Sequence, residues 1–155
     1  MTLRATLIAG LLVLAAATGA IAAGADPVKI TADQFVIDDT AHVATFTGKV
    51  IVKRSTSLTV WAPKVVVDYG DGGPSNIKSF VATGGVRIKT TDQDATGDKA
   101  VYDPDKQILR LTGNVMVTNS TGTVGGPELV VNLATNTSVF TGGKGGRVTG
   151  VFTPK

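Results

Sequence analysis

The segment "TFTGKVIVKR" at residues 45–54 decides the fold, because related segments return three times later in the chain. These are "VATGGVRIKT" at 81–90, "RLTGNVMVTN" at 110–119 and "VFTGGKGGRV" at 139–148. The Thr-Gly pairs fall at a near-constant spacing, at 47–48, 83–84, 112–113 and 141–142. The second copy is longer because it carries a Gly-Asp-Gly-Gly-Pro turn. Regular self-similarity of this kind indicates an internal repeat.

Each repeat predicts a β-hairpin. Two runs of alternating apolar and polar residues are separated by turn formers such as Asp38-Asp39-Thr40 and Asp103-Pro104-Asp105. The glycine of each Thr-Gly pair stands where the alternation changes direction, which predicts a bulge or bend between two sheet faces. The predicted fold is all-β: an elongated, twisted antiparallel sheet of four repeated hairpin units, folded on itself.

One face of the predicted strands is apolar in every repeat. Because side chains alternate across a strand, the inward positions can be aligned between repeats. The aligned residues include Phe35, Ile37, Phe46, Ile88, Tyr102, Leu111 and Phe140. Stacking of the units merges these positions into one apolar interior. This interior is either a dry core or a lipid-binding groove. A groove of this kind would shelter an acyl chain from water, which contributes about 0.8 kcal/mol per methylene.

The two ends of such a stack are expected to be exposed strand edges. They fall near Val28, Lys29 and Ile30 at one end, and near Val148, Val151 and Phe152 at the other. Pro27, Lys29 and Pro154 protect these edges only in part. Both ends are therefore predicted to accept a strand from a partner chain by β-augmentation.

The sequence offers little for enzyme chemistry. His42 is the only histidine and cysteine is absent, so neither supports a metal site. Asp33, Asp38, Asp98 and Asp103 could suggest calcium binding or glycoside hydrolysis, but they fall at strand starts and turns, where such side chains bind local backbone groups. We predict no catalytic residue, no metal and no cofactor. The formal net charge of the chain is +3, and Arg4 near the N-terminus contributes one of these charges. This charge is too small to argue for nucleic-acid binding.

The first 25 residues predict a secretory signal peptide. They carry Arg4, an apolar run and then small residues up to Ala25. The alternative is an uncleaved membrane anchor. The remaining residues, 26–155, suit one domain.

Four segments, spread from about Pro27 to Pro154, together resemble the LptA family, the OstA-like periplasmic bridge proteins of lipopolysaccharide transport. They are "VKITADQFVIDDTAHVATFTGKVIVKR", "APKVVVDY", "VYDPDKQILRLTGNVMV" and "RVTGVFTPK". The resemblance implies a β-jellyroll and a periplasmic conduit that is not an enzyme. Lipopolysaccharide would travel from the inner-membrane to the outer-membrane assembly complex with its acyl chains inside, driven by an ATPase elsewhere.

The resemblance also implies roles for particular residues. Val28 and Ile30 match interior positions of the family, and Ile88 and Tyr102 match positions that contact lipid. The strand with Val28 and Ile30 would join an LptC-like inner-membrane partner. The segment Val148 to Phe152 would join an LptD-like outer-membrane partner or the next copy in a head-to-tail oligomer.

Several alternatives stay open from the sequence. The same fold is expected in an anchored LptC-like protein and in a truncated LptD-like protein of the same pathway. An exported structural or polysaccharide-binding β-solenoid is a further possibility, and it would require either sealed apolar columns or convergent carboxylates in a cleft.

Overall fold

The computed structural model describes residues 27–154, apart from 55, 57, 74–75 and 144–145, so the predicted leader lies outside the described residues. The described chain forms one sheet of ten antiparallel strands and a short 3-10 helix at Gly70–Gly72. No helix in this part is long and apolar enough to cross a membrane. The strands are β1 Val28–Thr31, β2 Gln34–Asp38, β3 Val43–Arg54, β4 Leu58–Asp68, β5 Ser79–Thr90, β6 Gln93–Asp103, β7 Ile108–Asn119, β8 Gly122–Asn132, β9 Thr137–Thr141 and β10 Thr149–Phe152.

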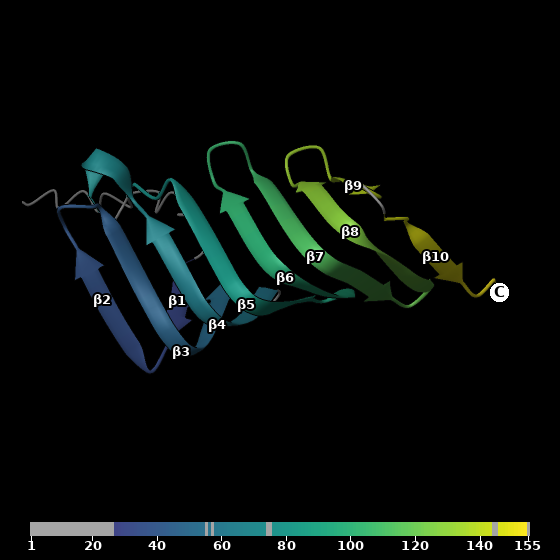
Figure 1. The fold of residues 1–155 in the computed structure, drawn as a ribbon, viewed down its shortest axis with the longest axis horizontal. Helices are drawn as coiled ribbons and strands as arrows, with labels where there is room; N and C mark the ends of the chain where they lie inside the picture. The colour runs from purple at the N-terminus through teal and green to yellow at the C-terminus, as the bar shows by residue number, and fades with distance from the viewer. Residues whose placement is uncertain (1–26, 55, 57, 74–75, 144–145, 155) are drawn as a thin grey trace, which may run out of the picture.

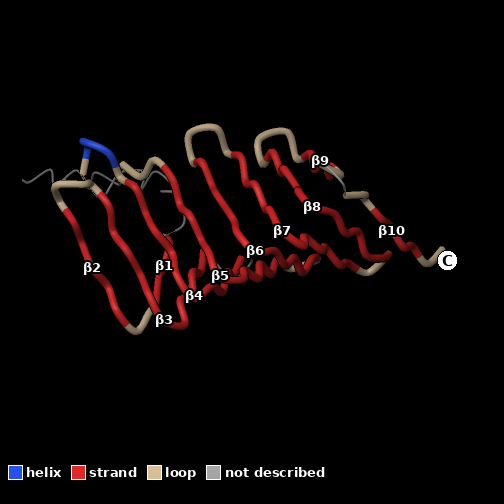
Figure 2. Tube along the Cα trace, in the orientation of Figure 1, coloured by secondary structure: helices blue, strands red, loops and turns tan. Residues whose placement is uncertain are grey.

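The sheet is folded lengthwise into two walls. The long strands β3 to β8 contribute one half to each wall, while β2 and β9 flank the first wall and β1 and β10 flank the second. The body is elongated, with β1 and β2 at one end and β9 and β10 at the other (Figure 1). The turns after β2, β6 and β8 lie along one margin (Figure 2). The predicted all-β, elongated antiparallel fold is confirmed.

The fold line between the walls is made by β-bulges at the repeated glycines. In β3, β5 and β7 the register shifts across the Thr-Gly pair, so that two residues of the bulged strand face one residue of the next. Gly48, Gly84 and Gly113 have φ of 84°, 91° and 79°, a region that L side chains rarely adopt. We call this line of bulges the crease. The predicted bend is confirmed at these three glycines; at the fourth, Gly142, the strand β9 ends at Thr141 and its pairing with β8 shows no register shift.

The crease also leaves no room for side chains at two of these glycines. A Cβ on Gly48 would lie 2.8 Å from the Cβ of Asp33, and one on Gly113 would lie 2.7 Å from the Cβ of Asp98. The Asp33 backbone N–H donates a 2.9 Å hydrogen bond to the Gly48 carbonyl. The aspartates that precede the Thr-Gly pairs by about one hairpin therefore pack against the crease.

The strand register confirms the predicted alignment of inward apolar residues between repeats. One row crosses the whole first wall through consecutive paired residues: Phe35, Phe46, Val65, Ala82, Ala100, Leu111, Leu129 and Phe140. Its neighbour, nearer the margin, contains Ile37, Ala44, Val67, Phe80, Tyr102, Leu109, Val131 and Ser138. Burial is deepest beside the crease, where Val50 and Leu111 are 1% exposed.

The turns of the repeats are built alike. The Asp38 carboxylate accepts 3.0 Å hydrogen bonds from the backbone N–H groups of Thr40 and Ala41, and Asp103 accepts one from Lys106. Asn132 plays the same part in its own turn. The local structural role predicted for Asp38 and Asp103 is confirmed.

The crease predicts that Gly113→Ala will lower the free energy of unfolding by about 1–3 kcal/mol, because Ala is strained at this φ and its Cβ meets Asp98. The matched control is Gly85→Ala at the second bulge position, where the φ of 98° is also unfavourable for Ala but an added Cβ meets no atom within 4 Å. Urea unfolding should show a clearly smaller loss for the control. Equal losses of unfolding free energy would mean that close packing between Gly113 and Asp98 does not stabilise the crease.

Candidate ligand-binding groove

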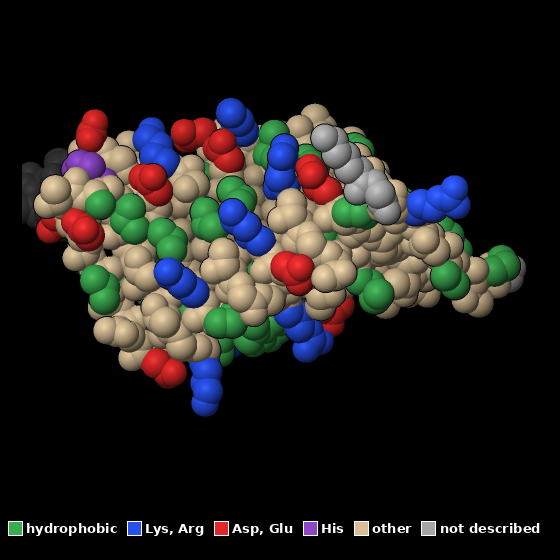
Figure 3. All heavy atoms as spheres, viewed as in Figure 1, with side chains coloured by type: hydrophobic (Ala, Val, Ile, Leu, Met, Phe, Trp, Pro, Cys, Tyr) green, Lys and Arg blue, Asp and Glu red, His purple; other side chains and the backbone are tan. Residues whose placement is uncertain are grey.

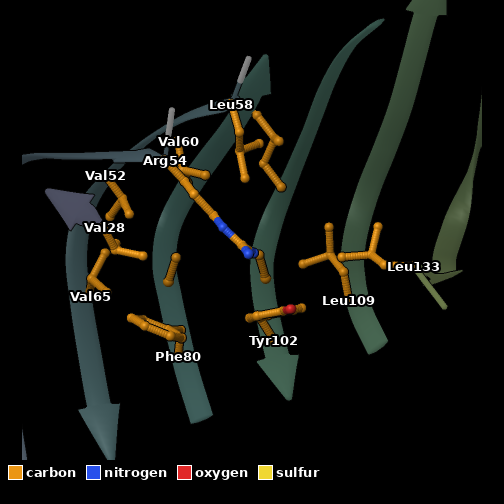
Figure 4. Close-up of a pocket in the computed structure, with 13 residues that line it drawn as sticks. Val28, Val52, Arg54, Leu58, Val60, Val65, Phe80, Tyr102, Leu109 and Leu133 are labelled. Carbon is orange, nitrogen blue, oxygen red and sulfur yellow. The ribbon is translucent and has the colours of Figure 1, made fainter. Parts of the chain in front are cut away.

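An apolar cavity of about 140 Å³ lies between the two walls. Its lining is apolar except for the hydroxyl of Tyr102 and the guanidinium of Arg54 (Figure 4). The lining residues are Val28, Val52, Arg54, Leu58, Val60, Val65, Phe80, Ala82, Ile88, Ala100, Tyr102, Leu109 and Leu133.

Strand alternation places these side chains on facing walls. Val60 of β4 lies between Val52 of β3 and Ile88 of β5 in one register row of the second wall. Phe80 of β5 pairs with Tyr102 of β6 in the first wall, and their ring centroids are 6.3 Å apart. A row of apolar residues from one wall thus faces a row from the other wall across the cavity.

A second, wider space lies at the end of the body formed by β1 and β2. Val28 lines both the cavity and a wider groove of about 570 Å³, which is also lined by Ile30, Thr31, Ala32, Phe35 and Phe46. The rings of Phe35 and Phe46 are stacked with centroids 4.6 Å apart, and Phe35 is 52% exposed. The apolar interior is therefore open to solvent at this end.

The predicted site residues fall into three groups. Val28, Ile88 and Tyr102 line the cavity, and Ile30, Phe35 and Phe46 line the end groove. Leu111 is buried in the crease, while Ile37 and Phe140 lie on the same inward rows but line neither space. Their contact with lipid stays a prediction.

The predicted partner-binding residues lie on the terminal strands or next to them. Lys29 is on β1, and Val151 and Phe152 are on β10, where they are 65% and 62% exposed. Val148 precedes β10 and is 41% exposed. Exposure of this kind is what an unpaired edge requires, but the partners themselves stay a prediction.

Sequence reasoning missed four lining residues, Arg54, Leu58, Val60 and Leu133. Arg54 follows Val50 and Val52 at the same period of two, so the alternation carried a signal for its inward position. Leu58 opens β4, and Leu133 follows β8 at the start of a turn. Since both lie where a strand begins or ends, the alternation there was too short to read.

The groups with shifted pKa lie outside the cavity. Hydrogen bonds from Arg87, at 2.6 and 3.1 Å, lower the pKa of the Asp94 carboxyl, and Arg87 also lies 5.4 Å from the ring of Trp61. Burial raises the pKa of the Tyr69 hydroxyl, which donates a 3.0 Å hydrogen bond to Asp39. Neither arrangement places an acid or a base in the lining of the cavity.

Charged side chains of both signs are interspersed over the face of the body seen in Figure 3. Within the described residues, no group of three or more His, Cys, Asp or Glu side chains could hold a metal ion. His42, for example, lies 3.3 Å from Asp71 at the margin. The lining of the cavity offers apolar contacts and one cationic group, Arg54.

Two comparisons bear on what this chain is. Its fold is similar to a crystal structure of LptH from Pseudomonas aeruginosa, described as the LptA-homologous periplasmic component of the conserved lipopolysaccharide transport device. The TM-score is 0.71 at 19% sequence identity, and the match covers 83% of this chain and 96% of that one. No curated protein of significant sequence similarity was found.

The model of one protein family, described as LptA/(LptD N-terminal domain) LPS transport protein, matches residues 29–137, which includes most of the two walls. The family resemblance seen in the repeats is thereby confirmed. This chain belongs to the LptA/LptD N-terminal domain family of lipopolysaccharide transport proteins.

Proposed function

We propose that this protein is a periplasmic bridge that binds lipopolysaccharide and carries it from the inner-membrane to the outer-membrane assembly complex. The observation that carries the proposal is the apolar interior between the walls, which opens at the end formed by β1 and β2. Family membership and the similarity to LptH support the same function. The predicted signal peptide supports the periplasmic location.

The groove matches the physical demand of the ligand. Acyl chains must be kept from water, and each buried methylene contributes about 0.8 kcal/mol. The cavity is large enough for a molecule of the size of benzene, so it holds only part of one acyl chain. Transport of a lipid with several chains therefore requires the walls to move apart, with the sugars outside the groove.

The terminal strands supply the proposed contacts with partners. In the described part of the chain, β1 and β10 each pair on one side only. An LptC-like strand would add to the edge at Val28 to Ile30. An LptD-like strand, or β1 of a second copy, would add to the edge at Val148 to Phe152. Successive grooves would then form one continuous path.

The proposed role is binding and transfer, without catalysis or a cofactor. A polysaccharide-binding β-solenoid is less well supported, because Asp38 and Asp103 bind their own turns and the cavity lining contains no carboxylate. A purely structural module is less well supported because the interior contains an open groove.

The first test is photocrosslinking of the mature protein to lipopolysaccharide from a reactive residue placed at Ile88. A crosslink is expected there, because Ile88 lines the cavity. The matched control is the adjacent Lys89, which points to the other face of β5. Crosslinking at both positions, or at neither, would contradict lipid binding in the groove.

Tyr102→Asp should weaken lipopolysaccharide binding at least tenfold, because a carboxylate facing acyl chains must be desolvated or protonated. Val101→Asp, its neighbour on the opposite face, should bind like the unmodified protein. Binding is measured with labelled lipopolysaccharide after circular dichroism has verified the fold of both variants. Unchanged binding by folded Tyr102→Asp would count against the groove.

Head-to-tail association should be lost in Phe152→Pro. The Thr153 N–H donates a 3.1 Å hydrogen bond to the Thr121 carbonyl of the turn before β8, so the N–H of Phe152 points to the opposite, open edge of β10. Proline removes that donor, whereas the control Phe152→Ala removes only the ring. Sedimentation should show concentration-dependent association for the unmodified and Ala proteins and monomers for the Pro variant. Equal association of all three would exclude this edge.

A further inference from the structure

Arg54 is the single charged residue among the thirteen that line the cavity. It is the last residue of β3, and its side chain points into the cavity towards β6 and Tyr102 (Figure 4). The residue is nevertheless exposed to solvent. Arg54 therefore lies where the apolar interior meets water.

The position follows from the pleat of β3. Val50, Val52 and Arg54 share the inward face, while Lys53 points outward. Arg54 pairs with Val28 on one side and with Leu58 on the other, and both of these residues also line the cavity. A cation thus takes the third inward position of β3 after Val50 and Val52, and it lies between two apolar neighbours on the adjacent strands.

An apolar surrounding makes this cation different from the other arginines of the sheet. Arg87 is paired with Asp94 at 2.6 Å, and Arg110 with Glu128 at 3.6 Å. Arg54 makes no ion pair with any carboxylate of the described residues. Its carbon stem can cover apolar surface while the guanidinium remains available for a ligand.

The complement of such a group is an anion on an amphipathic molecule. A guanidinium binds a phosphate or a carboxylate through two parallel hydrogen bonds, which are strong because both partners are charged. An acyl chain in the cavity brings its acidic head group to the boundary where Arg54 lies. We infer that Arg54 is the specificity-determining residue of the groove, which binds the acidic head group, phosphate or carboxylate, of the lipid whose chain occupies the cavity. This inference rests on the proposed lipid-binding function.

The test uses three amphiphiles with the same twelve-carbon chain below their micellar concentrations: dodecyl phosphate, dodecanoate and neutral dodecyl maltoside. Their affinities are measured by calorimetry for the full mature protein, for Arg54→Gln and for Lys53→Gln. The Lys53 variant makes the same change in charge one residue away, on the outer face. Circular dichroism verifies that the variants are folded.

We expect Arg54→Gln to bind at least one acidic amphiphile about tenfold more weakly, which is the effect of losing a hydrogen-bonded charge pair. The amphiphile that is weakened identifies the head group. Lys53→Gln should bind all three like the unmodified protein, and dodecyl maltoside should bind equally to all proteins. Lipopolysaccharide and its phosphatase-treated form should repeat the pattern if the head group is a phosphate.

Two results would overturn the role of Arg54. In the first, Arg54→Gln binds both acidic amphiphiles as tightly as the unmodified protein. In the second, Lys53→Gln loses as much affinity as Arg54→Gln, which would make the effect one of net charge. Failure of the unmodified protein to bind any of the three amphiphiles or lipopolysaccharide is distinguishable from both, because it would refute the groove itself and the role of Arg54 with it.

Discussion

The crease is the constraint on which the rest of the structure depends. A flat antiparallel sheet of this sequence would expose one apolar face along its full length, because its strands alternate. Bulges at Gly48, Gly84 and Gly113 fall in register on alternate strands, so every long strand turns at the same line. Folding along that line brings the two halves of the apolar face together and creates the core and the groove in one step.

The gradient of burial follows from the same geometry. Val50 and Leu111 lie within three residues of a bulge and are almost completely buried, because the walls are close together there. Phe35 shares the row of Leu111 but belongs to the terminal strand β2, and it is half exposed. Residues of one row can therefore belong to the core in the middle of the body and to the groove at its end. The sequence repeats, but the environment does not.

This difference marks the limit of what the sequence could predict. The strands, the bulges and the inward columns were predictable because period-two alternation and Thr-Gly pairs are local signals repeated several times. The depth of Leu111 was not, since burial depends on distance from the crease and from both ends. Arg54 carried a readable signal, yet a basic residue on an alternating strand is ordinarily assigned to the solvent face. Leu58 and Leu133 depend on how the turns close, which the strand pattern does not contain.

The two kinds of interaction in the structure would suit the proposed entry of a bulky lipid. Backbone hydrogen bonds run along each wall, from β2 to β9 and from β1 to β10, and they hold each wall as a unit. Across the groove the walls meet through apolar side chains such as Ile88 and Tyr102. Separating the walls therefore exposes apolar surface without breaking either ladder, and an entering acyl chain covers that surface again. Under the proposed function, the ligand would return the free energy lost in opening, and the groove would open without local unfolding.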